Sequence, residues 1–344
     1  MHVLVTGHRG YIGSILVPLL IEAGHRVTGL DSDIYRACNF GTTAVPAPDI
    51  VRDVRDVHPH DLEGYDAVIH LAGLSNDPLG NLDPVLTREI NTEATLRLAA
   101  AAKAAGVARF VFSSSCSNYG VSASGEWLDE RSALSPATPY AVSKVACEEG
   151  LDRLADGDFT TVYLRSATAY GMSPRIRFDL VVNNLTAWAV ATGQVRLKSD
   201  GRAWRPLVHA EDMAQAFVLA LTADRDLVHR QAFNVGRNED CMQIRDLAGI
   251  VNELVPEAEV TFSPESSADI RTYRVDCSKI RSIGFRPAWT VRKGIVQLRD
   301  AFRAHGVRVA DFEGERYQRV AHIMGLMRRG DLDAQLRWRA EITA

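Results

Sequence analysis

A glycine-rich segment near the start of the chain constrains its fold more than any other feature: Thr6-Gly7-His8-Arg9-Gly10-Tyr11-Ile12-Gly13. It follows a short apolar run and opens a stretch with helical spacing. Gly7 permits a tight turn, Gly10 lets the backbone approach a pyrophosphate, and Gly13 lets a helix pack closely while its N-terminal N–H groups face the anion. An ordinary glycine turn is the alternative, but the order of strand, loop and helix favours a dinucleotide-binding loop that includes Tyr11 and Ile12.

The order of apolar and helical segments along the chain extends this pattern. Short apolar runs alternate with longer helical patterns through the first two-thirds of the sequence, which predicts an α/β fold with a Rossmann-type, doubly wound parallel sheet covered on both faces. The predicted strands are His2 to Thr6, Arg26 to Leu30, Asp49 to Val51, Ala67 to Leu71, Arg109 to Ser113 and Thr160 to Leu164, and the predicted helices lie near 12–23, 84–105 and 138–155.

The second half of the chain is less regular. Gly, Pro and Arg-rich segments mix with helical patterns near 179–192, 209–222, 243–254 and 290–303, and no linker separates the halves. We expect a smaller, discontinuous α/β domain for the substrate, built from insertions that pack on the first domain. The expected boundaries are 1–170, joined by about 205–236, for the cofactor domain, 171–204 and 237–310 for the substrate domain, and 311–344 for a helical tail that caps the fold or helps it dimerise.

The composition of the chain limits the kinds of partner that it can bind. A net charge of −4 without a long basic run argues against nucleic acid or an anionic membrane, and no apolar run reaches the roughly 18 residues of a membrane span. The five cysteines show no C-x-x-C spacing, so we expect neither a disulfide scaffold nor a metal site. The chain begins directly in a strand pattern, not in a signal peptide. We expect a cytoplasmic protein with a small-molecule ligand.

Residues at the ends of the second to fourth predicted strands are candidates for the rest of the cofactor. Asp31 lies roughly 20 residues after the glycine loop, where a carboxylate accepts from the ribose hydroxyls and repels a 2′-phosphate, which favours NAD over NADP. Arg9 is the alternative partner of a 2′-phosphate, so NADP is not excluded. Asp53-Val54 is a candidate to contact the adenine, and Leu71-Ala72-Gly73 is a candidate to line the pyrophosphate. The alternative for either segment is that it ends a strand without a binding role.

A second motif is Tyr140-Ala141-Val142-Ser143-Lys144, preceded by Thr138 as an N-cap and Pro139 at the first helical position. Residues four apart share one face of a helix, so the Lys144 ammonium lies near the Tyr140 phenol. Together with a positive nicotinamide ring it lowers the tyrosine pKa towards working pH and makes Tyr140 a usable base. The alternative is a surface pair on an amphipathic helix.

A third motif, Phe112 to Gly120, is rich in hydroxyls and follows the fifth predicted strand, at the edge of the sheet where ligands bind. Ser115 can donate to a substrate oxygen while Tyr140 takes its proton. Taken alone, these serines are better explained as caps of a local turn. The three motifs together favour an active site.

In this order and spacing, the three motifs resemble the NAD-dependent epimerase/dehydratase family, the extended short-chain dehydrogenases/reductases that act largely on nucleotide sugars. The resemblance covers about residues 1–300 and implies Ser115, Tyr140 and Lys144 as the catalytic set. It also implies Asn91 as a structural or cofactor-side residue and Ser113 on the cofactor side. Its implied contacts to a nucleotide-sugar substrate are Ser75, Ser115, Cys116, Ser117, Thr168, Asn184, Leu185, Arg205, Asp269 and Arg271.

Departures from the family pattern bear on the reaction. Sugar 4,6-dehydratases of this family carry an Asp-Glu pair after the catalytic Ser or Thr, where this chain has Cys116 and Ser117, and Thr168 stands where an asparagine is common. A 4-epimerase needs no second acid or base. We therefore predict a homodimeric nucleotide-sugar epimerase with tightly held NAD, with a dehydratase or ketoreductase of the same fold as the alternative. A protein that senses NAD without turnover is disfavoured by the intact catalytic set, and Cys116 is either an extra acid–base group or a small buried side chain.

Overall fold

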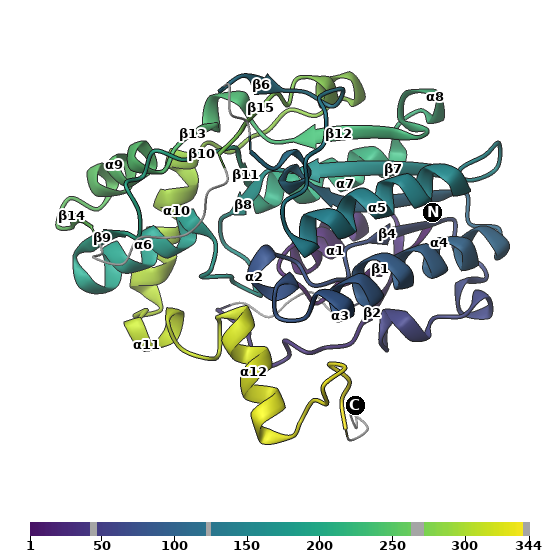
Figure 1. The fold of residues 1–344 in the computed structure, drawn as a ribbon, viewed down its shortest axis with the longest axis horizontal. Helices are drawn as coiled ribbons and strands as arrows, with labels where there is room; N and C mark the ends of the chain where they lie inside the picture. The colour runs from purple at the N-terminus through teal and green to yellow at the C-terminus, as the bar shows by residue number, and fades with distance from the viewer. Residues whose placement is uncertain (42–46, 122–124, 263–271, 340–344) are drawn as a thin grey trace.

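A parallel sheet forms the centre of the computed structural model, which describes residues 1–41, 47–121, 125–262 and 272–339. In this described part of the chain the sheet has seven strands in the order β12-β7-β5-β4-β1-β2-β3, and every neighbouring pair is parallel (Figure 1). The predicted doubly wound sheet is therefore confirmed. The strands are β1 (His2–Thr6), β2 (Arg26–Asp31), β3 (Asp49–Val51), β4 (Ala67–His70), β5 (Arg109–Ser115), β7 (Thr160–Ser166) and β12 (Gln231–Val235).

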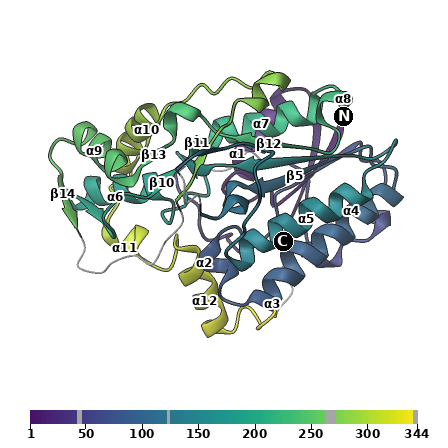
Figure 2. The same cartoon turned by 45° about the horizontal axis from the view of Figure 1, so that its top comes forward.

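Helices cover both faces of this sheet (Figure 2). Alternate residues of β1 point to opposite faces, so Val3 and Val5 pack in one apolar cluster and Leu4 in another. The first cluster lies under α1 and α7 and the second under α4 and α5. The bounds of these helices are α1 (Gly13–Glu22), α7 (Ala210–Thr222), α4 (Ala94–Ala104) and α5 (Pro139–Leu154).

The strand order reverses beside β1, which pairs with β2 on one side and β4 on the other. The loops that follow these strands diverge there, to opposite faces of the sheet, and leave a crevice at the carboxyl edge. The loops after β3, β5 and β7 end on the same edge because all the strands are parallel. The topology therefore brings the motifs after β1, β2, β4 and β5 to one place.

A smaller layered unit lies beside that edge (Figure 1). Its apolar core joins residues of several helices, of short strands and of the segments between them, including Phe178, Leu247 and Leu298. Pairs of short strands connect its parts, β9 with β14 and β10 with β13. The bounds are α6 (Val181–Thr192), α9 (Ile244–Leu254), α10 (Val291–Ala304), β9 (Gln194–Leu197), β14 (Glu259–Phe262), β10 (Trp204–Arg205), β13 (Met242–Gln243), β8 (Thr168–Tyr170) and β11 (Leu207–His209).

The C-terminal tail returns to the first domain. It holds two helices, α11 (Val309–Phe312) and α12 (Arg319–Arg329), and then residues 331–339, which we call the tail loop. The helix α12 ends at Arg329, and the next residue, Gly330, has a φ of 79°, the left-handed conformation typical of a helix C-terminus. The expected helical tail therefore does not continue through residues 331–339. In Figure 1 the tail runs below α2 (Asp77–Gly80) and α3 (Pro84–Thr87). Among the described helices, none combines the length and apolar character that crossing a bilayer requires.

The helix predicted near 84–105 is continuous but not uniform. A six-residue π-helix, Arg88–Glu93, joins α3 to α4. Within it, the Asn91 side chain accepts a hydrogen bond from the Leu74 N–H at 2.8 Å and donates to the Leu74 carbonyl at 3.1 Å. Single π turns often lie at functional sites because they re-aim one side chain. Here Asn91 holds the loop after β4.

Candidate active site

A cavity of about 890 Å³ lies at the carboxyl edge of the sheet. Most of the predicted site residues meet on its wall, although they come from segments far apart in the sequence. Those that line it are Gly7, Gly10, Tyr11, Ile12, Gly13, Asp31, Asp53, Val54, Leu71, Ala72, Gly73, Ser75, Ser113, Ser115, Ser117, Tyr140, Lys144, Thr168 and Arg205.

The glycine loop leaves room for an anion. Gly7 has a φ of 72°, and a Cβ placed there would lie 2.7 Å from the Ala72 nitrogen. A Cβ on Gly13 would lie 2.4 Å from the Gly7 carbonyl oxygen, so helix and loop pack too closely for a side chain. In the described chain, α1 has neither a side-chain cap nor an acidic residue in its first turn. Its positive N-terminus therefore fits a pyrophosphate.

Asp31 is held by backbone N–H groups at the end of β2. Its two carboxylate oxygens accept from the Arg9 N–H at 3.0 Å and from the Asp33 N–H at 2.8 Å. The Arg9 guanidinium is itself paired with Asp33 and Asp49, and Arg9 is not among the residues that line the cavity. Asp31, Asp33 and Asp49 thus gather three carboxylates beside Arg9, and two of them neutralise its guanidinium. Arg52, which lines the cavity, is paired with Asp61 at 2.6 Å. This arrangement favours NAD over NADP.

Replacing Asp31 with Ala is expected to weaken NAD binding by about tenfold or more, because the ribose of NAD loses hydrogen bonds to a charged acceptor. NADP binding should weaken by less, because the substitution also removes the repulsion between the carboxylate and the 2′-phosphate. The measurement is the dissociation constant of each cofactor by calorimetry. Asp31→Asn keeps an acceptor and should have an intermediate effect. An unchanged ratio of the two constants, with a changed ratio in Arg9→Ala, would assign the selectivity to Arg9 instead.

The catalytic motif lies at the start of α5, where Thr138 caps the helix by accepting from the Ala141 N–H at 3.2 Å. One helical turn places Tyr140 and Lys144 on the same face, with the Lys144 Nζ 5.6 Å from the centre of the Tyr140 ring. The Lys144 Nζ donates to the Ser113 carbonyl at the end of β5, at 2.7 Å. Ser115, from the same strand end, hydrogen-bonds the Tyr140 phenol. The predicted three residues therefore lie together.

Burial shifts the pKa values of this group. It raises the pKa of Tyr140, while the hydrogen bond from Ser115 and the positive charge of Arg177 lower it. Burial also lowers the pKa of Lys144 to about 8, so the ammonium form still predominates at neutral pH. Tyr140 therefore needs further positive charge beside it to act as a base, and a nicotinamide ring in the cavity fits that need.

An ion pair that the motifs did not predict also lines the cavity. The Arg177 guanidinium contacts the Asp179 carboxylate at 2.5 Å and the Ser75 hydroxyl at 3.3 Å, and Asn76 donates to Asp179 at 2.6 Å. These residues follow β4 and β8 and meet only in the fold. Two charges separated by one residue in a Gly- and Pro-rich segment are more often a solvated loop, so the sequence carried no distinguishing signal. Lys198 is a further cation of the wall that the motifs did not predict.

Several predicted contacts lie elsewhere. Cys116 is buried, its thiol donates to the Arg165 carbonyl at 3.1 Å, and burial raises its pKa, so it is a small core side chain and not an acid–base group. The Asn184 amide donates to the Phe178 carbonyl at 3.0 Å and Leu185 is in the core, both away from the cavity lining. The predicted contacts Asp269 and Arg271 lie outside the described residues.

Fold and cavity together define a dinucleotide-dependent enzyme of the extended short-chain dehydrogenase/reductase class. The chain belongs to the NAD dependent epimerase/dehydratase family, whose model matches residues 3–236. This confirms the predicted family and the prediction of NAD as the cofactor.

The chain aligns with individual relatives over nearly the full length of each relative. The chain is 29% identical to a UDP-glucose 4-epimerase of Mycolicibacterium smegmatis, over 88% of this chain and 99% of that protein. A UDP-glucose 4-epimerase of Thermus thermophilus solved with NAD is 29% identical, with a TM-score of 0.73 and coverage of 88% and 99%. A dTDP-glucose 4,6-dehydratase of Streptomyces venezuelae solved with NAD is 26% identical, with a TM-score of 0.77 and coverage of 90% and 100%. Both activities therefore occur on this fold.

Proposed function

We propose that this protein is a nucleotide-sugar epimerase that transiently oxidises a sugar hydroxyl and then restores it with inverted configuration. The observation that carries the proposal is the buried group of Ser115, Tyr140 and Lys144 in one cavity with the glycine loop. What NAD supplies when bound is the transient oxidation, by accepting a hydride from the sugar carbon and returning it. The chain supplies the proton transfer and the binding of the sugar.

Each catalytic side chain has a role that its position supports. Ser115 donates to the reacting sugar oxygen, and Tyr140 takes the hydroxyl proton and later returns it. Lys144 holds its charge near the phenol, anchored by the Ser113 carbonyl, and so favours the tyrosinate. A proton acceptor next to a positively charged group in a buried site is an arrangement suited to general base catalysis at neutral pH.

The end of β5 distinguishes epimerisation from dehydration. Elimination of water needs an acid and a base beside the catalytic serine, and the neighbouring positions are Cys116 and Ser117. Cys116 is buried with a raised pKa and Ser117 is a neutral hydroxyl that lines the cavity. Asp179 also lines the cavity, but its bidentate pairing with Arg177 lowers its pKa, which makes it a poor acid. These features favour the epimerase over the dehydratase.

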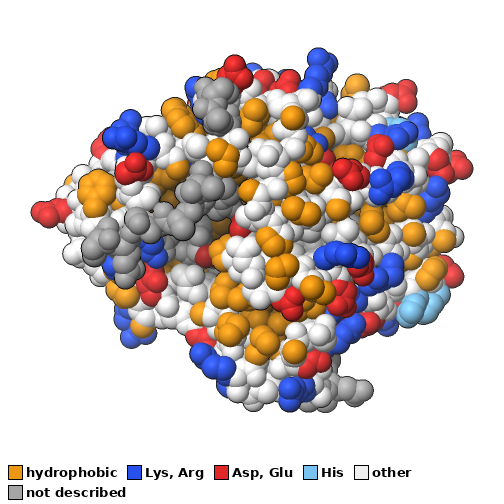
Figure 3. All heavy atoms as spheres, in the orientation of Figure 1, with side chains coloured by type: hydrophobic (Ala, Val, Ile, Leu, Met, Phe, Trp, Pro, Cys, Tyr) orange, Lys and Arg blue, Asp and Glu red, His pale blue; other side chains and the backbone are white. Residues whose placement is uncertain are grey.

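We further propose that residues 1–170 with about 205–236 hold the cofactor, and that 171–204 and 237–310 hold the nucleotide sugar. Arg205 and Lys198 supply positive charge to the cavity wall for a diphosphate. A cytoplasmic location agrees with five free cysteines, all within the described chain. A homodimer agrees with the exposed apolar side chains Leu82, Val85 and Val142, which lie on or beside α2, α3 and α5. Figure 3 shows apolar side chains gathered in the lower middle of this face.

The test is incubation of the purified protein, with its bound nicotinamide recorded by absorbance, with UDP-, GDP- and dTDP-sugars while NMR follows the products. The expected result is an isomeric sugar without net consumption of cofactor, and the changed carbon names the reaction. A dehydrated keto product, or steady consumption of NADH or NADPH, would establish the dehydratase or ketoreductase instead. No conversion of any sugar would reject the enzymatic proposal.

A further inference from the structure

Part of the cavity wall comes from the C-terminal tail. Arg319 and Ile323 of α12 and Leu336 of the tail loop line the same cavity as the glycine loop. Their exposed fractions are 2%, 0% and 5%. These side chains are therefore built into the interior of the site and do not merely lie near its mouth.

The tail meets the cavity at the end expected for adenosine. Leu336 packs in an apolar cluster with Leu74, from the loop after β4, and Ile34, from the loop after β2. In a doubly wound sheet, the adenosine half of a dinucleotide lies over β2 and β3, on the far side of β1 from the catalytic strand. The sheet order places β2 and β3 at that edge, and β5 with Ser115 across β4 and β1. Leu336 thus faces the adenosine half.

One anchor of the tail loop is beside Asp31. The Trp338 indole N–H donates to the carbonyl of Ser32 at 2.7 Å, directly after the residue that faces the ribose hydroxyls. The Arg36 guanidinium lies over the Trp338 ring, 4.2 Å from its centre. A cation over an indole ring strengthens the contact, so the loop after β2 and the tail loop form one unit.

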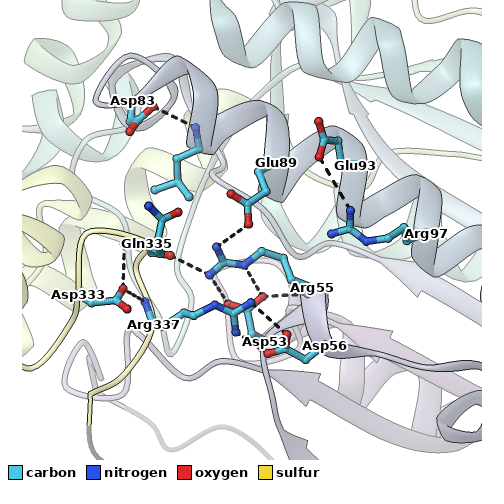
Figure 4. A network of polar contacts seen from close by, with 11 residues as sticks. Asp53, Arg55, Asp56, Asp83, Glu89, Glu93, Arg97, Asp333, Gln335 and Arg337 are labelled. Atoms are coloured by element: carbon cyan, nitrogen blue, oxygen red, sulfur yellow. Dashed lines mark hydrogen bonds and ion pairs between the residues drawn. The ribbon is translucent and has the colours of Figure 1, made fainter.

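A second anchor lies beside Asp53 (Figure 4), which with Val54 is a candidate contact for the adenine. Arg55 is buried, forms two hydrogen bonds with Asp53, and also donates to the Gln335 carbonyl at 2.8 Å. Arg337 pairs with Asp56 at 2.5 Å. The tail loop is therefore tied to the turn after β3 on both sides of Leu336.

The backbone of the loop aims Leu336 inward. Leu336 has a φ of 56°, a conformation that a leucine rarely adopts. The Asp333 carboxylate holds the loop in this shape by accepting from the N–H groups of Gln335 at 2.8 Å and Arg337 at 2.9 Å. A strained residue that points into a cavity and is fixed by its neighbours suggests a requirement at that position.

We propose that the tail loop is part of the NAD site, with Leu336 packed against the adenosine half of the cofactor, and that it slows the dissociation of NAD. The proposal goes beyond the epimerase activity and rests on the NAD dependence of the family, not on the identity of the sugar. A reaction that returns the hydride in every cycle has no need to release the cofactor, and a wall over the adenosine keeps it bound.

The test measures binding without turnover. Leu336→Gly removes the side chain at a position whose φ suits glycine, so the backbone should keep its path. The protein is loaded with NADH, chased with excess NAD, and the loss of NADH fluorescence gives the dissociation rate. We expect the rate to rise about tenfold or more, and the affinity for AMP to fall by a similar factor, because an apolar contact is lost. Binding of nicotinamide mononucleotide should not change.

The control is Arg328→Ala on α12, which precedes the tail loop; the Arg328 side chain is 69% exposed and pairs with Glu315, and neither residue lines the cavity. Its NADH dissociation rate should stay within about twofold of the parent. If thermal unfolding shows that Leu336→Gly does not fold, Leu336→Asn replaces it, because asparagine tolerates this φ. The proposal would be overturned if the folded variant had the same NADH dissociation rate and the same AMP affinity as the parent. It would also be overturned if the affinity for nicotinamide mononucleotide fell as much as the affinity for AMP. None of these outcomes depends on which sugar is converted.

Discussion

Replacing Tyr140 with Phe is expected to reduce turnover by about a thousandfold while NAD remains bound. The variant keeps the ring that fills the cavity wall and removes only the hydroxyl that carries the proton, and proton transfer by a positioned side chain contributes about 10²- to 10⁴-fold. The measurement pairs the initial rate on the sugar that the parent converts with the affinity for NADH. The rate should fall and the affinity should change by less than about threefold.

The control for this variant is Tyr65→Phe. Tyr65 packs against His2, with the ring centres 4.2 Å apart, and is not among the residues that line the cavity. It should retain nearly full activity. If Tyr140→Phe kept its turnover within a few-fold of the parent, another group would be the base and the catalytic assignment would be wrong. If both rate and NADH affinity fell, the hydroxyl would be needed for the shape of the site instead.

The second large effect is on stability. Replacing Glu148 with Gln is expected to lower the free energy of unfolding by about 3 kcal/mol or more, because it leaves the Arg165 guanidinium buried without its counter-charge. The Glu148 carboxylate accepts from Arg165 at 2.6 Å and from Asn118 at 3.0 Å, and the exposed fraction of both charged side chains is 7%. Urea unfolding of the protein measures the change.

Glu149→Gln is the matched control, since Glu149 is the next residue on α5 and is exposed. Its effect should stay within about 0.5 kcal/mol. A double variant, Glu148→Leu with Arg165→Met, should recover much of the loss because it removes both charges together. Equal effects of Glu148→Gln and Glu149→Gln would show that the ion pair is not buried in solution.

The sequence predicted those parts of the protein that depend on local pattern. The six predicted strands all form, because most of them are apolar runs buried in a parallel sheet, and the bounds of β1 are as predicted. Gly7 and Gly13 were identifiable because the backbone packs so closely at these two positions that only glycine fits. Tyr140 and Lys144 were identifiable because helical spacing alone puts them on one face. These motifs identified most of the predicted cofactor residues, and the fold places those residues in one cavity.

The parts that depend on distant packing were not predictable. Arg9 was a candidate for a phosphate because its sequence neighbours do not reveal its pairing with Asp49 from β3. Cys116 was a candidate acid–base group because sequence does not reveal which side of a turn faces the core. Ile323 and Leu336 are ordinary apolar residues in a charged tail, and their place in the cavity depends on contacts made across most of the chain.

The tail loop has a further consequence for how this site is made. Trp338 and Ser32 are 306 residues apart, and Gln335 and Arg55 are 280 apart. At a translation rate of about 5–20 residues per second, the ribosome completes the tail loop roughly 15 to 60 s after the loop following β2. The residues of the glycine loop are therefore synthesised well before those of the tail loop, so the proposed wall over the adenosine is the last part of this site to be made.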